Sequence, residues 1–322
     1  MGSGARAHGA DIPVVVTVDL EPDGPGHLVS SRSTWNGIEA TRRWVDQIRA
    51  RIEGASGRTF RVSWLVRCDP QVEEIFGSPS HLIDVAPDLY AEAAERGDAI
   101  GLHIHGWRRV EGEGWVDDYG DDAWFEECID RSFAAYADAF GRPCRIVSFG
   151  NRFMGPAAIA RLAHHGVAVD VTGEPGNGPV ADGDWPHVRG LIPDYRRMPR
   201  RPHPLAPGVI ELPMTAGRKR KGLRPKAHLS RMRRHGLRER LDHPVQLGGR
   251  DLPGVAFGEV MADSLRHQDR PYLSFAVRSD GILDPVQHPR LVGHLDELLA
   301  LPEAGRFAFL TPTEALSALG AA

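Results

Sequence analysis

The sequence of 322 residues predicts a single α/β domain folded as a barrel. Short apolar runs that are typical of buried parallel strands alternate with segments of helical periodicity along most of the chain. About seven such strands over roughly 310 residues favour a barrel over an open sheet. Because no low-complexity linker and no repeat interrupts the alternation, we expect one domain over residues 12–322, preceded by a flexible tail over 1–11.

Each expected element is marked by its pattern. The first strand is a continuous apolar run, and the first helix carries Ile38, Val45 and Ile48 at helical spacing. Residues 173–207, rich in Gly, Pro and Arg, are expected to form a long irregular loop over the site. The expected strands cover 12–16, 60–66, 99–105, 146–149, 167–170, 209–213, 272–277 and 307–310, and the expected helices cover 33–52, 87–96, 121–140, 156–165 and 291–300.

The composition is that of a globular protein rather than a membrane-spanning one. The chain is 41% hydrophobic and 25% charged, which is enough for a large core, and no run approaches the length of a membrane span. The first ten residues lack the apolar centre of a secretion signal. Cys68, Cys128 and Cys144 show no ligand spacing, so we expect reduced thiols and a cytoplasmic protein without a cysteine-bound zinc.

One segment is strongly basic. Residues 217–240 hold eleven Lys or Arg and one acid. Because the whole chain has a net charge of −4, the rest of the chain has a net charge of −14. The segment, expected as an insertion over 217–243, is either a solvated excursion or an anion-binding flap over a phosphorylated or nucleotide-linked substrate. Without interleaved aromatic residues, and in an acidic chain, we expect no nucleic-acid partner. The oligomeric state is left open.

Three carboxylates follow the first strand. Asp19, Glu21 and Asp23 alternate within five residues, just before Gly24. The carboxyl ends of parallel strands are where α/β proteins place their catalytic groups. Crowded acids repel unless a metal ion or a shared proton relieves them, which favours a functional site. The alternative is a turn and helix cap, which also favour Asp and Gly.

Two histidines end the third strand. His103 and His105 lie at i and i+2, so both point to the same side of an extended chain. Alone, this pattern is also typical of surface histidines. Together with a carboxylate from the first strand it matches the ligands that zinc prefers.

These motifs resemble the polysaccharide deacetylase superfamily, which comprises metal-dependent amidohydrolases on a distorted (β/α)7 barrel. Residues 17–21 stand at the place of its first acidic motif, and Ile100, Gly101 and His103 match the start of its histidine motif. Further similar segments are 64–67, 191–195, 211–215 and 309–315, so the resemblance runs from about Val14 to Leu316.

The chain departs from this pattern at three motifs. Trp107 stands where the family has its second histidine, so His105 would have to serve instead. Gly150 stands at the place of an arginine, with Arg152 two positions later. Arg278 replaces a histidine that acts as general acid, and guanidinium does not give up its proton.

The resemblance implies roles for these residues. Asp19 would be the general base, and Arg278 and Arg152 would complete the catalytic group. Arg278 would bind an oxyanion or an anionic part of the substrate, while His203 or His105 would protonate the leaving group. Glu21, His103 and His105 would hold a divalent ion, zinc above all. The expected substrate-binding residues are Trp107, Asp23, Tyr195 and Glu211, with Trp115 as a further stacking candidate.

Three functions follow from the motifs and their departures. The first is a hydrolase that removes an acetyl or formyl group from the nitrogen of a small amino sugar or sugar-like substrate. The second is an altered or inactive relative that binds a carbohydrate or an anionic ligand. The third is a metal-independent hydrolase of another C–N bond.

Overall fold

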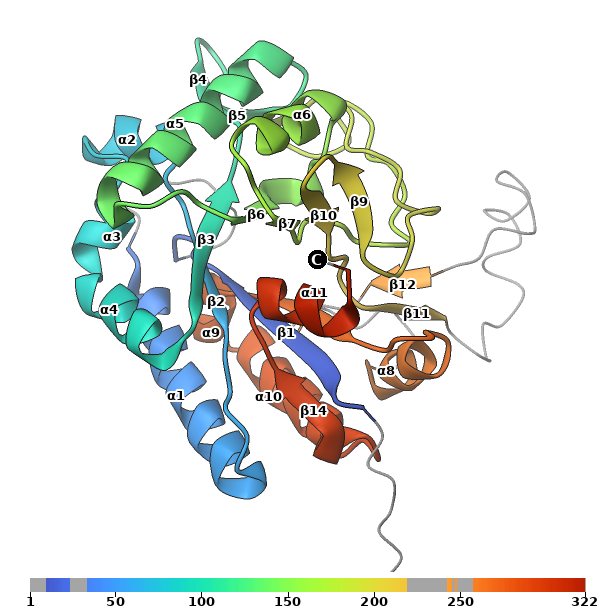
Figure 1. Cartoon of the computed structure of the whole chain (residues 1–322). Coiled ribbons are helices and arrows are strands. Elements are labelled where there is room, and N and C mark those ends of the chain that lie inside the picture. The colour runs from blue at the N-terminus through green and yellow to red at the C-terminus, as the bar shows by residue number, and fades with distance from the viewer. Residues whose placement is uncertain (1–9, 24–33, 219–241, 245–246, 248–256, 322) are drawn as a thin grey trace, which may run out of the picture.

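A computed structural model describes residues 10–23, 34–218, 242–244, 247 and 257–321. Within them the chain forms one α/β domain whose main sheet curls into a distorted barrel (Figure 1), which confirms the predicted fold class. All eight predicted strands are present, some of them shorter than expected. The strands of this sheet are β1 (Ile12–Asp19), β2 (Ser63–Val66), β3 (Ala99–Ile104), β6 (Ile146–Phe149), β7 (Val169–Asp170), β9 (His203–Ala206), β10 (Val209–Glu211), β13 (Leu273–Arg278) and β14 (Phe307–Phe309).

The strand order is β13-β1-β2-β3-β6-β7-β10-β9, with β14 paired to β1. Every pair is parallel except β10 with β9. Two hydrogen bonds join the ends of the curl beyond β10: the Thr215 amide donates to the Ser274 carbonyl at 2.9 Å, and the Ser274 amide donates to Thr215 Oγ1 at 2.7 Å. The parallel strands therefore point their carboxyl ends into one shared opening.

The side chains of β1 that point into the barrel form an apolar layer at one end and a polar layer at the other. Val15, Thr17 and Asp19 share one face of the strand because side chains alternate with period two. Val15 packs with apolar residues of other strands and with Leu316 of α11 (Pro312–Leu319), which lies across the end of the barrel opposite the carboxyl ends of the strands (Figure 1). Apolar packing thus fills the end near Val15, while Asp19 reaches the carboxyl end, where polar residues gather.

Helices cover the outer face of the sheet and bury its other set of side chains, among them Val14, Val16 and Val18. Helix α1 carries the predicted stripe of Ile38, Val45 and Ile48 against this layer. The helices are α1 (Asn36–Ser56), α2 (Pro70–Phe76), α3 (His81–Val85), α4 (Pro87–Arg96), α5 (Asp122–Phe140), α6 (Pro156–His164), α8 (Phe257–Arg266), α9 (Ser279–Leu283) and α10 (Gln287–Leu299), with single turns η1 (Gly150–Arg152) and η2 (Ala304–Arg306).

The predicted loop over 173–207 is more ordered than expected. It contains β9 and also β8 (Val188–Arg189), which joins the hairpin of β4 (Trp107–Val110) and β5 (Gly114–Asp118) in a three-stranded sheet. The hairpin was not predicted, because its two short strands show no regular alternation of apolar and polar residues. It brings Asp117 beside the third strand of the barrel, where the site lies.

Two predicted segments fall mostly outside the described residues. These are the N-terminal tail, described only from residue 10, and the basic insertion over 217–243, of which 219–241 are not described. At the two ends of that insertion, β11 (Ala216–Arg218) pairs antiparallel with β12 (Asp242–Pro244). No helix within the described ranges is long and apolar enough to cross a bilayer.

Candidate metal centre and active site

The carboxyl ends of the strands surround a cavity of about 230 Å³. Asp19 comes from the end of β1, His103 from β3 and Arg278 from the end of β13. All six residues that the sequence predicted as catalytic or metal-binding contribute to its wall. The lining consists of Asp19, Glu21, His103, His105, Ser148, Phe149, Asn151, Arg152, Thr172, Glu174, Trp185, Met214 and Arg278.

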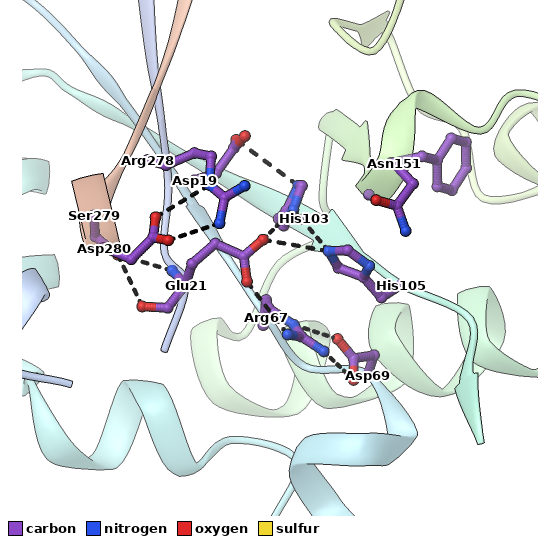
Figure 2. Close-up of polar contacts among 12 residues, drawn as sticks. Asp19, Glu21, Arg67, Asp69, His103, His105, Asn151, Arg278, Ser279 and Asp280 are labelled. Atoms are coloured by element: carbon purple, nitrogen blue, oxygen red, sulfur yellow. Dashed lines mark hydrogen bonds and ion pairs between the residues drawn. The ribbon is translucent and has the colours of Figure 1, made fainter. Parts of the chain in front are cut away.

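Three metal-ligand side chains converge in this wall. Glu21 Oε1 lies 3.1 Å from His103 Nε2 and 3.3 Å from His105 Nε2, and the two histidine nitrogens lie 3.2 Å apart. Figure 2 shows the Glu21 carboxylate between these histidines and Arg67. The three side chains are at least 95% buried. Two imidazoles and one carboxylate are a ligand set suited to zinc.

Asp117 fixes the orientation of His105, a role that the sequence did not reveal. His105 Nδ1 lies 2.8 Å from Asp117 Oδ2, so Nδ1 donates a proton and Nε2 faces Glu21 and His103. Asp117 is fully buried and also accepts bonds from the Gly106 amide, the Tyr119 hydroxyl and the Asn151 amide. Burial lowers the pKa of His105, but Asp117 and Glu21 together outweigh this effect and raise the pKa to about 9.

Gly150 makes room for His105. A methyl group added at Gly150 would lie 2.1–2.3 Å from three atoms of the His105 ring. No other side chain fits there without moving the histidine. The absence of a side chain at Gly150 and the position of the His105 ring are therefore linked by packing.

The charge around the centre suits a divalent cation. Asp19, Glu21, Asp69 and Asp117 are all at least 93% buried and are linked through this cluster to one buried cation, Arg67. Arg67 bonds Glu21 at 3.3 Å and Asp69 at 2.7 Å, which leaves the group strongly negative unless histidines are protonated. Buried Asp19 Oδ1 and His103 Nδ1 have no hydrogen-bond partner among the described residues. The residues present thus fit a metal ion.

Asp19 and Arg278 stand at the ends of adjacent strands. Burial raises the pKa of Asp19, while His103, 3.8 Å from its carboxylate, opposes that rise. Arg278 donates two hydrogen bonds to Asp280, at 3.1 and 2.7 Å, so its guanidinium is held by that carboxylate (Figure 2). Among the described residues, no arginine or lysine therefore lies within hydrogen-bond distance of the buried Asp19 Oδ1.

The four predicted substrate-binding residues lie outside the cavity lining. Trp107 is buried and packs behind His105, with ring centroids 6.1 Å apart. The Asp23 carboxylate accepts hydrogen bonds from the first amides of α1, and Tyr195 donates to the Arg152 carbonyl. Glu211 is buried beneath Gly173. His203, a predicted acid, also lies outside the lining.

Replacing Asp117 by asparagine is expected to weaken zinc binding about 10- to 100-fold, the usual effect of losing an outer carboxylate. The Asn amide can donate to His105 Nδ1, which favours a proton on Nε2 and removes its lone pair from the centre. Calorimetric titration with zinc measures the change. Asp138→Asn, an exposed carboxylate on α5, is the matched control. Equal affinity in the two variants would contradict this role of Asp117.

A second pair of acids lies beneath the cavity. Asp170 and Glu211 are register partners on β7 and β10, and both are fully buried. Each binds one backbone amide at 2.8 Å, while Asp170 Oδ2 and Glu211 Oε2 have no partner among the described residues. Burial raises the pKa of Asp170 to about 6 and, together with Asp170, raises that of Glu211 well above its ordinary value. Burial and the mutual repulsion of the two carboxylates therefore both favour the protonated forms of this pair.

This pair predicts a stability that falls with rising pH. Because the folded-state pKa values are raised, the stabilisation is complete below about pH 4, the unfolded value, and is lost as pH rises through 6 and beyond. In Glu211→Gln the amide can donate to Asp170, so this loss should shrink. Urea denaturation at pH 5 and 8 tests it, with exposed Glu95→Gln as control. A pH dependence unchanged by Glu211→Gln would contradict it.

No protein-family model and no curated protein sequence matches the chain. Solved structures that it resembles include an allantoinase (12% identity, 97% of this chain and 91% of that one, TM-score 0.48). Others are a probable polysaccharide deacetylase from Pseudomonas aeruginosa (11%, 96% and 91%, TM-score 0.48) and a family 4 acetyl xylan esterase from Clostridium thermocellum with a cobalt ion (12%, 96% and 93%, TM-score 0.43). Because their TM-scores are below 0.5, these similarities assign no activity to this chain. Any activity has to be argued from the geometry of the site.

Proposed function

We propose that this protein is a metal-dependent hydrolase that removes an acetyl or formyl group from the nitrogen of a small amino sugar or sugar-like substrate. The observation that carries the proposal is the convergence of Glu21, His103 and His105, whose ligand atoms all lie within 4.8 Å of one another. Asp19 stands beside them, 3.8 Å from His103. This arrangement supports hydrolysis of an amide by a water molecule that a metal ion and a general base activate together.

Each residue has a distinct task in the reaction. Glu21, His103 and His105 would hold the ion, which when bound lowers the pKa of a water molecule and polarises the acyl carbonyl. Asp19 accepts the proton of the attacking water. Because burial raises its pKa, Asp19 is also suited to return that proton to the leaving amine. Arg278 cannot donate a proton but adds positive charge to the cavity wall.

The size of the cavity favours a small substrate. Its volume is about 230 Å³, which is below the usual range of roughly 300–1,000 Å³ for ligand pockets. One sugar ring with its acyl group is therefore a better candidate than a segment of a polymer. Trp185 in the wall supplies an aromatic face for such a ring.

A metal-independent hydrolase of another C–N bond is the second candidate. It is favoured by the bond between Arg67 and Glu21 and by the raised pKa of His105. The positive charges of Arg67 and a protonated His105 would then offset the buried carboxylates without a metal ion. In that case Asp19 and a protonated His105 would transfer protons without an ion. The two candidates differ in whether zinc restores activity after chelation.

The test uses protein stripped of metal and reloaded with zinc. We expect release of acetate or formate from N-acetyl- or N-formylglucosamine by the loaded protein, and no release by His103→Ala. Exposed His164→Ala on α6 is the matched control and should behave as wild type. Turnover that is indifferent to chelation would favour the second candidate, and no turnover of either sugar would contradict the proposed substrate class.

A further inference from the structure

We propose that Arg152 is the subsite for a carboxylate on the substrate, so that the protein selects acidic over neutral N-acyl sugars. The inference rests on the proposed function and adds a substrate class to it. Arg152 lines the cavity and its side chain is only 16% exposed. Its position, contacts and backbone conformation each favour recognition of an anion.

The backbone presents Arg152 in a conformation that side chains rarely adopt. Asn151 and Arg152 have φ angles of 49° and 54°, in the left-handed region. Such a conformation is rare for residues other than glycine and persists where the surroundings impose it. Here Asn151 Nδ2 donates to Asp117 at 2.8 Å, and Tyr195 donates to the Arg152 carbonyl. The turn at Asn151 and Arg152 is therefore hydrogen-bonded to Asp117, the carboxylate that also orients His105.

The guanidinium of Arg152 is held on two sides. Its Nη1 lies 3.4 Å from Glu174 Oε2, and its central carbon lies 5.2 Å from the ring of Trp185. Its Nε is buried without a hydrogen-bond partner among the described residues. A buried donor without a partner is costly, and a carboxylate bound along the Nε–Nη2 edge would satisfy it in the bidentate geometry that suits arginine.

The other charges of the cavity direct an anion to the same place. Asp19 and Glu21 would repel a second carboxylate from the metal side of the wall. Arg278, the other arginine of the lining, is bound by Asp280 at 3.1 and 2.7 Å. The contact of Arg152 with Glu174, also a lining residue, is longer at 3.4 Å, and the buried Nε of Arg152 has no hydrogen-bond partner among the described residues. Arg152 is therefore the cation of the described lining that is best placed to receive the anionic group, while the acyl group faces His103.

The test measures binding rather than turnover, so that it does not depend on hydrolysis. The zinc-loaded protein is titrated with N-acetylglucosamine, with its C6 uronate, and with its 1- and 6-phosphates. We expect the uronate to bind about 10- to 100-fold more tightly than the neutral sugar, as for a charge-assisted pair. Arg152→Gln should abolish this preference, and Arg152→Lys should keep part of it. Exposed Arg43→Gln is the matched control.

Three results would overturn the inference. They are a preference of less than twofold in the wild-type protein, a preference that survives undiminished in Arg152→Gln, and tight binding of the phosphates alone. If the preference is present but the zinc-loaded protein hydrolyses none of these sugars, the proposed function fails and the carboxylate subsite stands.

Discussion

Asp19→Asn is expected to lower kcat by about 10²- to 10⁴-fold, the usual contribution of a general base. The substitution preserves the shape of the side chain but removes its ability to accept a proton. Asp19 is 93% buried and its Oδ1 has no hydrogen-bond partner among the described residues, so no structural contact of that oxygen is lost. Zinc affinity should change far less than kcat.

The measurement is steady-state turnover and zinc titration of the same preparation. Exposed Asp138→Asn on α5 controls for the loss of one negative charge and should retain wild-type kcat. An Asp19→Asn variant that binds zinc normally and keeps more than a tenth of the activity would show that another group is the base.

Gly150→Ala is expected to displace His105 and weaken zinc binding by at least about 10- to 100-fold, the loss typical of disturbing a ligand's support. The added Cβ would lie 2.1 Å from the His105 ring, a distance that real atoms do not tolerate. Overpacking of this kind also destabilises a protein by about 1–3 kcal/mol. Calorimetric zinc titration and urea denaturation measure the two effects.

Gly54→Ala is the matched control for this substitution. Gly54 lies in α1 and a Cβ there meets nothing within 4 Å, so alanine should leave zinc binding unchanged and stabilise the helix by up to about 1 kcal/mol. If Gly150→Ala bound zinc as tightly as Gly54→Ala, His105 would not be a ligand.

Much of the site could be predicted because local rules decide it. The alternation of side chains along an extended chain predicts that Asp19 and Glu21 point to one side, and likewise His103 and His105. The prediction holds although β1 ends at Asp19 and β3 ends at Ile104, because the second residue of each pair follows its strand by no more than two positions. The carboxyl ends of parallel strands then bring these pairs to one opening. Both conclusions need only the sequence near each strand, and the structure bears out the convergence.

The supporting residues could not be predicted because they depend on tertiary packing. Asp117 reaches His105 from a hairpin whose strands show no clear pattern, and Arg67 reaches Glu21 from the end of a neighbouring strand. Trp107 illustrates the converse error. Continued alternation would aim it into the cavity beside His105, but β3 ends at Ile104 and Trp107 begins a new strand that packs behind the histidine.

A crystal structure of the zinc-loaded protein, with anomalous data collected at the zinc edge, tests the central claim most directly. We expect a single strong peak among Glu21, His103 and His105, next to Asp19, that disappears in His105→Ala. The absence of a peak at this position, or a zinc ion bound elsewhere with these three side chains still bonded to one another, would contradict the metal centre and the hydrolase built on it.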